Sequence, residues 1–92
     1  MALKRIYVDF HKVDNQRRLV LTTLGTIEDL KRYGIELKEG MRLAFYSDDE
    51  DMEGHPDELR VDGTVLYDTD RDRWIAEIDW NEIRHASDAA RS

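Results

Sequence analysis

Two alternating runs joined by a charged turn, residues 59–80, constrain the fold of this chain more than any other stretch. In the first run every second residue is apolar or glycine: Leu59, Val61, Gly63, Val65 and Tyr67. The second run repeats this spacing: Trp74, Ala76, Ile78 and Trp80. A period of two residues is typical of a half-buried strand. The segment between them, residues 68–73, has no apolar side chain and is short enough to close an antiparallel hairpin.

Two positions in this predicted hairpin bear on its shape and its surface. Gly63 lies in mid-strand, where glycine weakens pairing, and it predicts a bulge or a close backbone approach that bends the strand. Ile75 lies on the face opposite Trp74, which leaves two interpretations of the tryptophans open. Either at least one of them belongs to the core, or the strand is covered on both faces and an exposed Tyr67 or tryptophan marks a partner surface.

Further alternating runs surround the hairpin. Residues 4–11 and 18–22 predict two strands that pair as an N-terminal hairpin, and residues 41–46 predict another strand. A tight turn at residues 81–82 returns Ile83 as a short last strand. The expected fold class is mostly β (α+β): a small five-stranded antiparallel barrel with one short helix.

The helix is expected between the second and third of these runs. Thr26 is placed to cap it, Asp29 lies in its first turn at the positive end of the helix dipole, and Gly34 is a left-handed terminator. A helix of about two turns is not stable alone. We therefore expect Ile27 and Leu30 to pack on the sheet.

Length and composition limit what the domain can hold. A chain of 92 residues forms one domain, assigned to residues 1–85, and the small polar residues 86–92 predict a disordered tail. Without cysteine the chain has no disulfide or thiolate metal site, and no cofactor is expected. The apolar runs are too short for a membrane span or a secretory signal, so we expect a cytoplasmic protein that does not bind membranes.

The net charge of −7 comes from one segment, because residues 48–58 hold seven acidic groups and no lysine or arginine. This placement argues against nucleic-acid binding, which needs cations to neutralise phosphates. Three interpretations of the segment stay open: a solvated loop, an anionic docking loop for a basic partner, or a weak calcium site. Asp49, Asp51, Glu53 and Gly54 approximate the first positions of a calcium loop, but Arg60 stands where its last carboxylate is needed.

Residues 37–85 resemble an SH3-like small β-barrel, of the kind found in uncharacterised bacterial proteins. A turn ending in Glu39-Gly40-Met41, a strand, an acidic loop and a hairpin whose second strand opens with Trp74 follow each other in the same order. Eukaryotic SH3 domains bind proline-rich peptides through aromatic residues beside an acidic loop, and Tyr46, Tyr67 and Trp74 are similar in kind. The chain departs from that family at Ile75, where a second aromatic would stand.

No arrangement typical of an enzyme is present, since no two histidines have metal-ligand spacing and the glycines are scattered singly. The sequence therefore predicts a non-enzymatic interaction module that docks a basic or extended protein segment. Its predicted partner-binding residues are aromatic or acidic: Tyr46, Asp48, Asp49, Glu50, Asp51, Glu53, Tyr67 and Trp74. The alternatives are a structural or regulatory subunit that pairs through a sheet edge and a weak calcium-binding domain. The sequence leaves the oligomeric state and the identity of the protein partner open.

Overall fold

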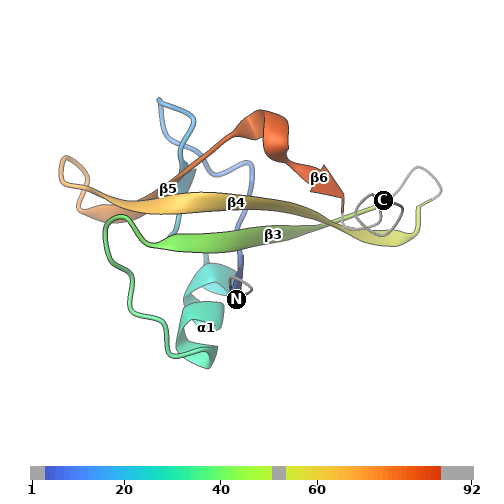
Figure 1. Ribbon diagram of the computed structural model, residues 1–92, viewed down its shortest axis with the longest axis horizontal. Helices are drawn as coiled ribbons and strands as arrows, with labels where there is room; N and C mark the ends of the chain where they lie inside the picture. The colour runs from blue at the N-terminus through green and yellow to red at the C-terminus, as the bar shows by residue number, and fades with distance from the viewer. Residues whose placement is uncertain (1–3, 51–53, 86–92) are drawn as a thin grey trace.

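The computed structural model describes residues 4–50 and 54–85. In chain order the elements are β1 (Arg5–Tyr7), β2 (Leu19–Val20), α1 (Leu24–Arg32), β3 (Arg42–Glu50), β4 (Pro56–Asp68), β5 (Arg73–Ile78), the 3-10 helix η1 (Trp80–Glu82) and β6 (Arg84–His85). Figure 1 shows β3 and β4 as two long strands across the molecule, with α1 on one side of them and η1 and β6 on the other. The predicted tail, residues 86–92, lies outside the described residues.

The hairpin predicted for residues 59–80 is confirmed, because β4 and β5 pair antiparallel and leave a turn at residues 69–72. Gly63 marks a close approach rather than a bulge, since the register runs through it without a break. A Cβ atom at this position would lie 2.8 Å from the carbonyl oxygen of Glu77 and 2.9 Å from Cε2 of Phe45. Glycine is therefore the residue that fits between β3 and β5 without displacing either.

The sheet is open and mixed, so the prediction of a closed five-stranded antiparallel barrel is wrong. Six strands take part, in the order β1-β3-β4-β5-β2, with β6 also paired to β4. β1 runs parallel to β3, with Ile6 opposite Phe45. The two N-terminal strands lie at opposite edges instead of forming a hairpin, and an isolated bridge joins Val13 to Leu19. Alternation predicted the strands but not their partners, because the period of two is the same in parallel and antiparallel pairs.

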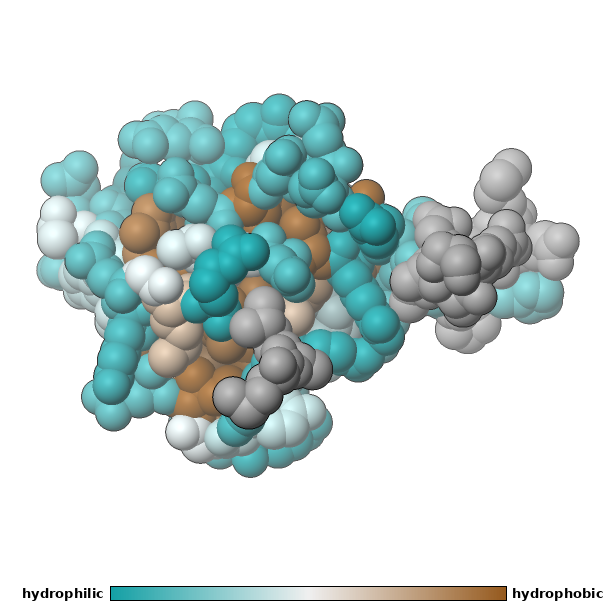
Figure 2. All heavy atoms as spheres, in the orientation of Figure 1, coloured by the Kyte–Doolittle hydropathy of each residue, from teal (hydrophilic) through white to brown (hydrophobic). Residues whose placement is uncertain are grey.

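The core lies on one face of this sheet and draws on the strands from both edges: Ile6, Val8, Leu19, Leu21, Leu43, Phe45, Val61, Val65 and Ala76. Trp74 and Trp80 are both partly buried and pack against this cluster. Ile75, on the other face, is fully buried as well, so β5 is covered on both faces. Figure 2 shows hydrophobic residues gathered at the centre of the visible face, with hydrophilic residues around them.

Helix α1 differs from its prediction in where it begins and in which face packs on the sheet. Its N-cap is Thr23, not Thr26, while Gly34 follows its end with the expected positive φ of 63°. Ile27, expected to pack on the sheet, is 38% exposed. The buried residues of the helix are Thr26 and Asp29, so the packed face is partly polar.

Polar side chains of α1 form hydrogen bonds with the backbone groups on the outer edge of β1. Because the N–H of Val8 donates to the carbonyl of Tyr46 in β3, the backbone groups of Tyr7 point the other way, toward α1. The Tyr7 N–H donates to Oδ2 of Asp29 at 2.9 Å, and the hydroxyl of Thr26 donates to the Tyr7 carbonyl. Buried backbone groups need such partners, which explains why polar residues of α1 face the sheet.

The end of the chain follows the prediction more closely. η1 makes the tight turn, and Asp79 caps it by accepting a hydrogen bond from the Asn81 N–H at 2.9 Å. β6 then pairs with β4 at Leu59 and Arg60, which confirms the short last strand. Among residues 4–50 and 54–85, no helix is both long enough and apolar enough to span a bilayer.

Candidate functional site

The acidic segment forms the end of a two-stranded ribbon in its described part, whereas the sequence predicted a loop. The register pairs acidic residues with one another and with proline: Asp48 with Glu58, Asp49 with Asp57, and Glu50 with Pro56. Figure 1 shows this end of β3 and β4 extending past α1 and β5. We call residues 47–50 and 56–58 the acidic ribbon. Asp51 and Glu53, also predicted as partner-binding residues, lie outside the described residues.

The ribbon extends because its neighbours end before it. β1 pairs with β3 only as far as Tyr46, and β6 pairs with β4 only at Leu59 and Arg60. Within the described ranges, no third strand accompanies residues 47–50 or 56–58. The acidic ribbon therefore presents one strand edge on its β3 side and another on its β4 side.

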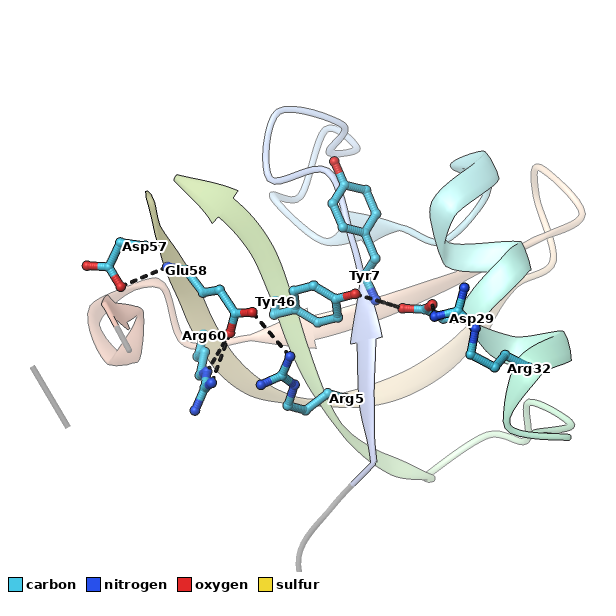
Figure 3. A network of polar contacts seen from close by, with 8 residues as sticks. All are labelled: Arg5, Tyr7, Asp29, Arg32, Tyr46, Asp57, Glu58 and Arg60. Carbon is cyan, nitrogen blue, oxygen red and sulfur yellow. Dashed lines mark hydrogen bonds and ion pairs between the residues drawn. The ribbon is translucent and has the colours of Figure 1, made fainter. Parts of the chain in front are cut away.

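Tyr46 lies at the base of the acidic ribbon and belongs to a network that joins β3 to β1 and α1. Its ring packs edge-on against Tyr7, with 5.7 Å between the ring centroids, and the guanidinium of Arg5 lies 4.8 Å from its centroid. Its hydroxyl donates to Oδ2 of Asp29 at 3.1 Å. Figure 3 shows the ring pointing from β3 toward Asp29. Tyr46 thus links three elements instead of standing free for a partner.

Asp29 is the buried centre of this network. Its residue is only 5% exposed, and its carboxylate accepts from the Tyr7 N–H and the Tyr46 hydroxyl. Nη1 of Arg32, one turn later in α1, lies 3.5 Å from the other carboxylate oxygen. A buried carboxylate is stable only when paired and hydrogen-bonded, and these contacts supply both.

Burial raises the pKa of the Tyr46 phenol above its ordinary value of 10.0, and the hydrogen bond to Asp29 and the negative charge of Asp29 raise it further. The positive charge of Arg5 acts in the opposite direction and is outweighed. Tyr46 is therefore the proton donor toward Asp29 throughout the neutral range.

A second set of contacts connects the acidic ribbon to β1. Glu58 pairs with Nη2 of Arg5 at 3.2 Å and with Nη2 of Arg60 at 2.9 Å. Figure 3 shows its carboxylate between the two guanidinium groups. All three side chains are partly exposed, so each pair contributes about 0–1 kcal/mol. Their main effect is to neutralise Glu58 at the base of the ribbon and leave the acidic charge further out.

The other two predicted aromatic residues lie far from the acidic ribbon. Tyr67 packs edge-on against Trp74 with 4.9 Å between centroids, beside the β4–β5 turn. Tyr46 is opposite Arg60, which precedes Tyr67 by seven positions in β4, or about 23 Å of extended strand. The structure therefore does not bring Tyr67 and Trp74 together with the acidic residues.

An open cleft of about 530 Å³ lies beside β4, in the gap between the end of β5 and the start of β6. Three arginines and four carboxylates line it, and Arg60 and Arg84 face each other across the strand pair. Arg60 is paired with Glu58, and Arg84 with Glu82 at 3.1 Å. The charges of this cleft largely compensate each other, so it favours neither an anion nor a cation.

The described residues do not reproduce the geometry of a calcium loop. Residues 49–50 and 56–60, which would belong to the twelve-residue loop, lie instead in paired strands. Among the described residues, no group of three histidine or carboxylate side chains is placed to hold a metal ion.

Sequence reasoning missed Asp29 and Arg5, two residues that position the base of the ribbon. The sequence places Asp29 in the first turn of the helix, at the positive end of its dipole, whereas in the structure Asp29 accepts hydrogen bonds from Tyr7 on β1 and Tyr46 on β3. One feature of the sequence points to Asp29: the apolar face of the helix is too small to hold the helix on the sheet, so a polar residue must contribute. Arg5 carried no distinguishing signal, because its partner Glu58 is 53 positions away.

No family model, curated protein or solved structure matches this chain. The resemblance to SH3-like barrels therefore has only the order of elements in residues 37–85 behind it. The closed barrel that the resemblance implied is replaced by an open six-stranded sheet.

Proposed function

We propose that this protein is a non-enzymatic interaction module that docks a basic segment of another protein on the acidic ribbon. One observation carries the proposal: β3 and β4 continue beyond the rest of the sheet as a strand pair in which five of seven residues are acidic. Where the structure describes burial, the buried residues of β3 and β4 end at Phe45 and Val61 on the side toward the ribbon. A surface maintained without a packing role is a candidate for binding.

The pairing within the ribbon favours a cationic partner. Its register places Asp49 opposite Asp57, further out along the ribbon than Glu58 with its arginine partners Arg5 and Arg60. Like charges directly opposite each other destabilise an antiparallel pair, and a bound cation relieves that repulsion. Lysine or arginine side chains would also be attracted by the overall charge of −7, which speeds encounter at low salt.

The proposed surface is smaller than the one inferred from the sequence. It keeps the acidic residues of the ribbon and leaves out Tyr67 and Trp74, because Tyr67 lies nine positions beyond Glu58, or about 30 Å along β4. Tyr46 contributes by fixing the base of the ribbon through Asp29. The same concentration of negative charge supports the expectation that nucleic acid is not the partner.

The test is a titration of the labelled protein with a short lysine-rich peptide, followed by amide chemical shifts. We expect shifts confined to the ribbon and an affinity about ten-fold lower in the double variant Asp48→Asn, Asp49→Asn. The matched control changes the same charge elsewhere, at the exposed residues Glu36→Gln and Asp70→Asn. Equal affinity in both double variants would reject the acidic ribbon as the docking surface.

The strand edges of the ribbon favour a second candidate, a structural subunit that pairs edge to edge with a second copy or with a partner's sheet. The self-pairing form predicts a dimer at high protein concentration, and added salt favours it because salt screens the repulsion between two acidic ribbons. Sedimentation of the unmodified protein distinguishes it from the docking module, which predicts a monomer that binds basic peptides.

A further inference from the structure

We propose that the docked segment adds to the sheet as an extended strand along the β3 edge of the acidic ribbon, at Asp48 and Glu50, and not along the β4 edge. This inference rests on the proposed function and specifies how the partner binds. Strand addition supplies affinity through main-chain hydrogen bonds, and the charges on both chains supply selectivity.

The β3 edge has donors and acceptors directed outward. In β3 the N–H of Ala44 donates to the carbonyl of Lys4, and the carbonyl of Tyr46 accepts from Val8. Even-numbered residues of β3 thus face the β1 side, and the alternation continues to Asp48 and Glu50. β1 ends at Tyr7, so an added strand would continue the line of β1 along β3.

The β4 edge of the ribbon has no N–H to offer. Val65 exchanges hydrogen bonds with Gly40 and Met41 on the β3 side, so odd-numbered residues of β4 face β3 and even-numbered residues face outward. The outward residues of the ribbon are Pro56, which has no N–H, and Glu58. The N–H of Glu58 already donates to Oδ1 of Asp57 at 2.8 Å. A strand added along this edge would meet backbone carbonyl groups but no free N–H group to complete the pairing.

The outer edges of β1 and β2 are occupied at Tyr7 and Val20. Side chains of α1 satisfy the Tyr7 groups on the outer edge of β1. On β2, the N–H of Val20 donates to the carbonyl of Lys12. The β3 edge beyond Tyr46 is therefore where the described residues offer a pair of outward donors to an incoming strand.

Charge identifies the occupant. A second copy of this chain would bring its own acidic ribbon to the edge, and the two would repel each other. A segment with lysine or arginine at alternating positions would instead place cations beside the acidic residues while its backbone pairs with Asp48 and Glu50. The occupant is thus an extended basic segment of a different protein.

The decisive experiment compares two peptides of equal charge. One alternates lysine with valine, and the other is the same peptide with every backbone N–H methylated, so that neither of its edges can pair with a strand. We expect the methylated peptide to bind about ten-fold more weakly, because it loses main-chain hydrogen bonds and keeps its charge. A second measurement is amide hydrogen exchange, which should slow at Asp48 and Glu50 on binding and stay unchanged at Glu58.

A pair of protein variants tests the same edge from the other side. Asp48→Asn removes the charge alone, whereas Asp48→Pro also removes the outward N–H and leaves the pairing with β4 in place. We expect the proline variant to bind the unmethylated peptide more weakly than the asparagine variant. Spectra of the free variants show whether the ribbon is intact, and the peptide comparison remains valid if it is not.

The outcomes separate the inference from the proposed function. If both peptides bind the ribbon equally and exchange at Asp48 is unchanged, docking stands and strand addition is overturned. Protection at Glu58 in place of Asp48 would overturn the choice of edge. If neither peptide binds, the proposed function and the inference fail together.

Discussion

Asp29 is the residue at which α1, β1 and β3 meet, and its replacement tests how much that meeting contributes to stability. Asp29→Asn keeps the size of the side chain but removes the charge that faces Tyr7, Tyr46 and Arg32. We expect a loss of about 1–3 kcal/mol in the free energy of unfolding, measured by urea denaturation, because the amide keeps one neutral acceptor oxygen and places an NH2 donor where the second carboxylate oxygen stood. The control is Glu28→Gln, which removes a charge from the exposed side of the same helix. Equal stability of the two variants would show that the network around Asp29 is dispensable.

Tyr46 makes stability depend on pH in the alkaline range. Its pKa is raised in the folded protein, so the unfolded chain loses the phenolic proton first, near pH 10. Stability from this group is fully present below that pH and is lost as the pH rises through the folded-state pKa. We expect Tyr46→Phe to be about 1 kcal/mol less stable at pH 8, with the difference from the unmodified protein shrinking above pH 10. Urea denaturation at both pH values checks this, and a constant difference would contradict it.

Among the elements, the central hairpin depends on the absence of a side chain at Gly63. Gly63→Ala places a Cβ atom within 2.8 Å of the Glu77 carbonyl oxygen and 2.7 Å from Cγ2 of Ile78. Because one of these atoms is backbone, the strands must move apart, and we expect about 1–3 kcal/mol of destabilisation in urea. Asp62→Ala, an exposed neighbour in the same strand, is the control. A Gly63→Ala protein as stable as this control would mean that β4 and β5 separate at no cost.

The strands themselves could be predicted from the sequence, whereas their pairing could not. Alternation located β4, β5 and the start of β3, because burial on one face leaves a period of two in the sequence. The parallel pairing of β1 with β3 has no such signature, since it depends on contacts between residues 39 positions apart, such as Ile6 and Phe45. The sequence predicts too late a start for α1, because Thr26, a good capping residue, donates its hydroxyl to the Tyr7 carbonyl instead. The sequence predicts a loop for the acidic ribbon, because Asp and Glu have low strand propensity.

At the scale of the whole molecule, the acidic charge lies on the same residues as the open strand edges. A strand edge with unpaired N–H and C=O groups invites pairing with other copies of the chain, and charged residues are a common protection against it. Here the acidic groups concentrate in residues 48–58, and the rest of the chain is neutral. The negative charge that opposes pairing between the ribbons of two copies would also attract a basic segment of another protein.

Neutralising the acidic ribbon should therefore make the protein self-associate. The triple variant Asp48→Asn, Asp49→Asn, Glu50→Gln reduces the charge from −7 to −4 and keeps the outward N–H groups of β3. We expect it to form dimers whose population rises with protein concentration in sedimentation velocity at low salt, while the unmodified chain stays monomeric. The control removes three charges elsewhere, at the exposed residues Glu28→Gln, Glu36→Gln and Asp70→Asn, and should also stay monomeric. Dimers of the unmodified protein at low salt would contradict the protective role of the charge, and dimers of the control alone would place the self-associating surface elsewhere.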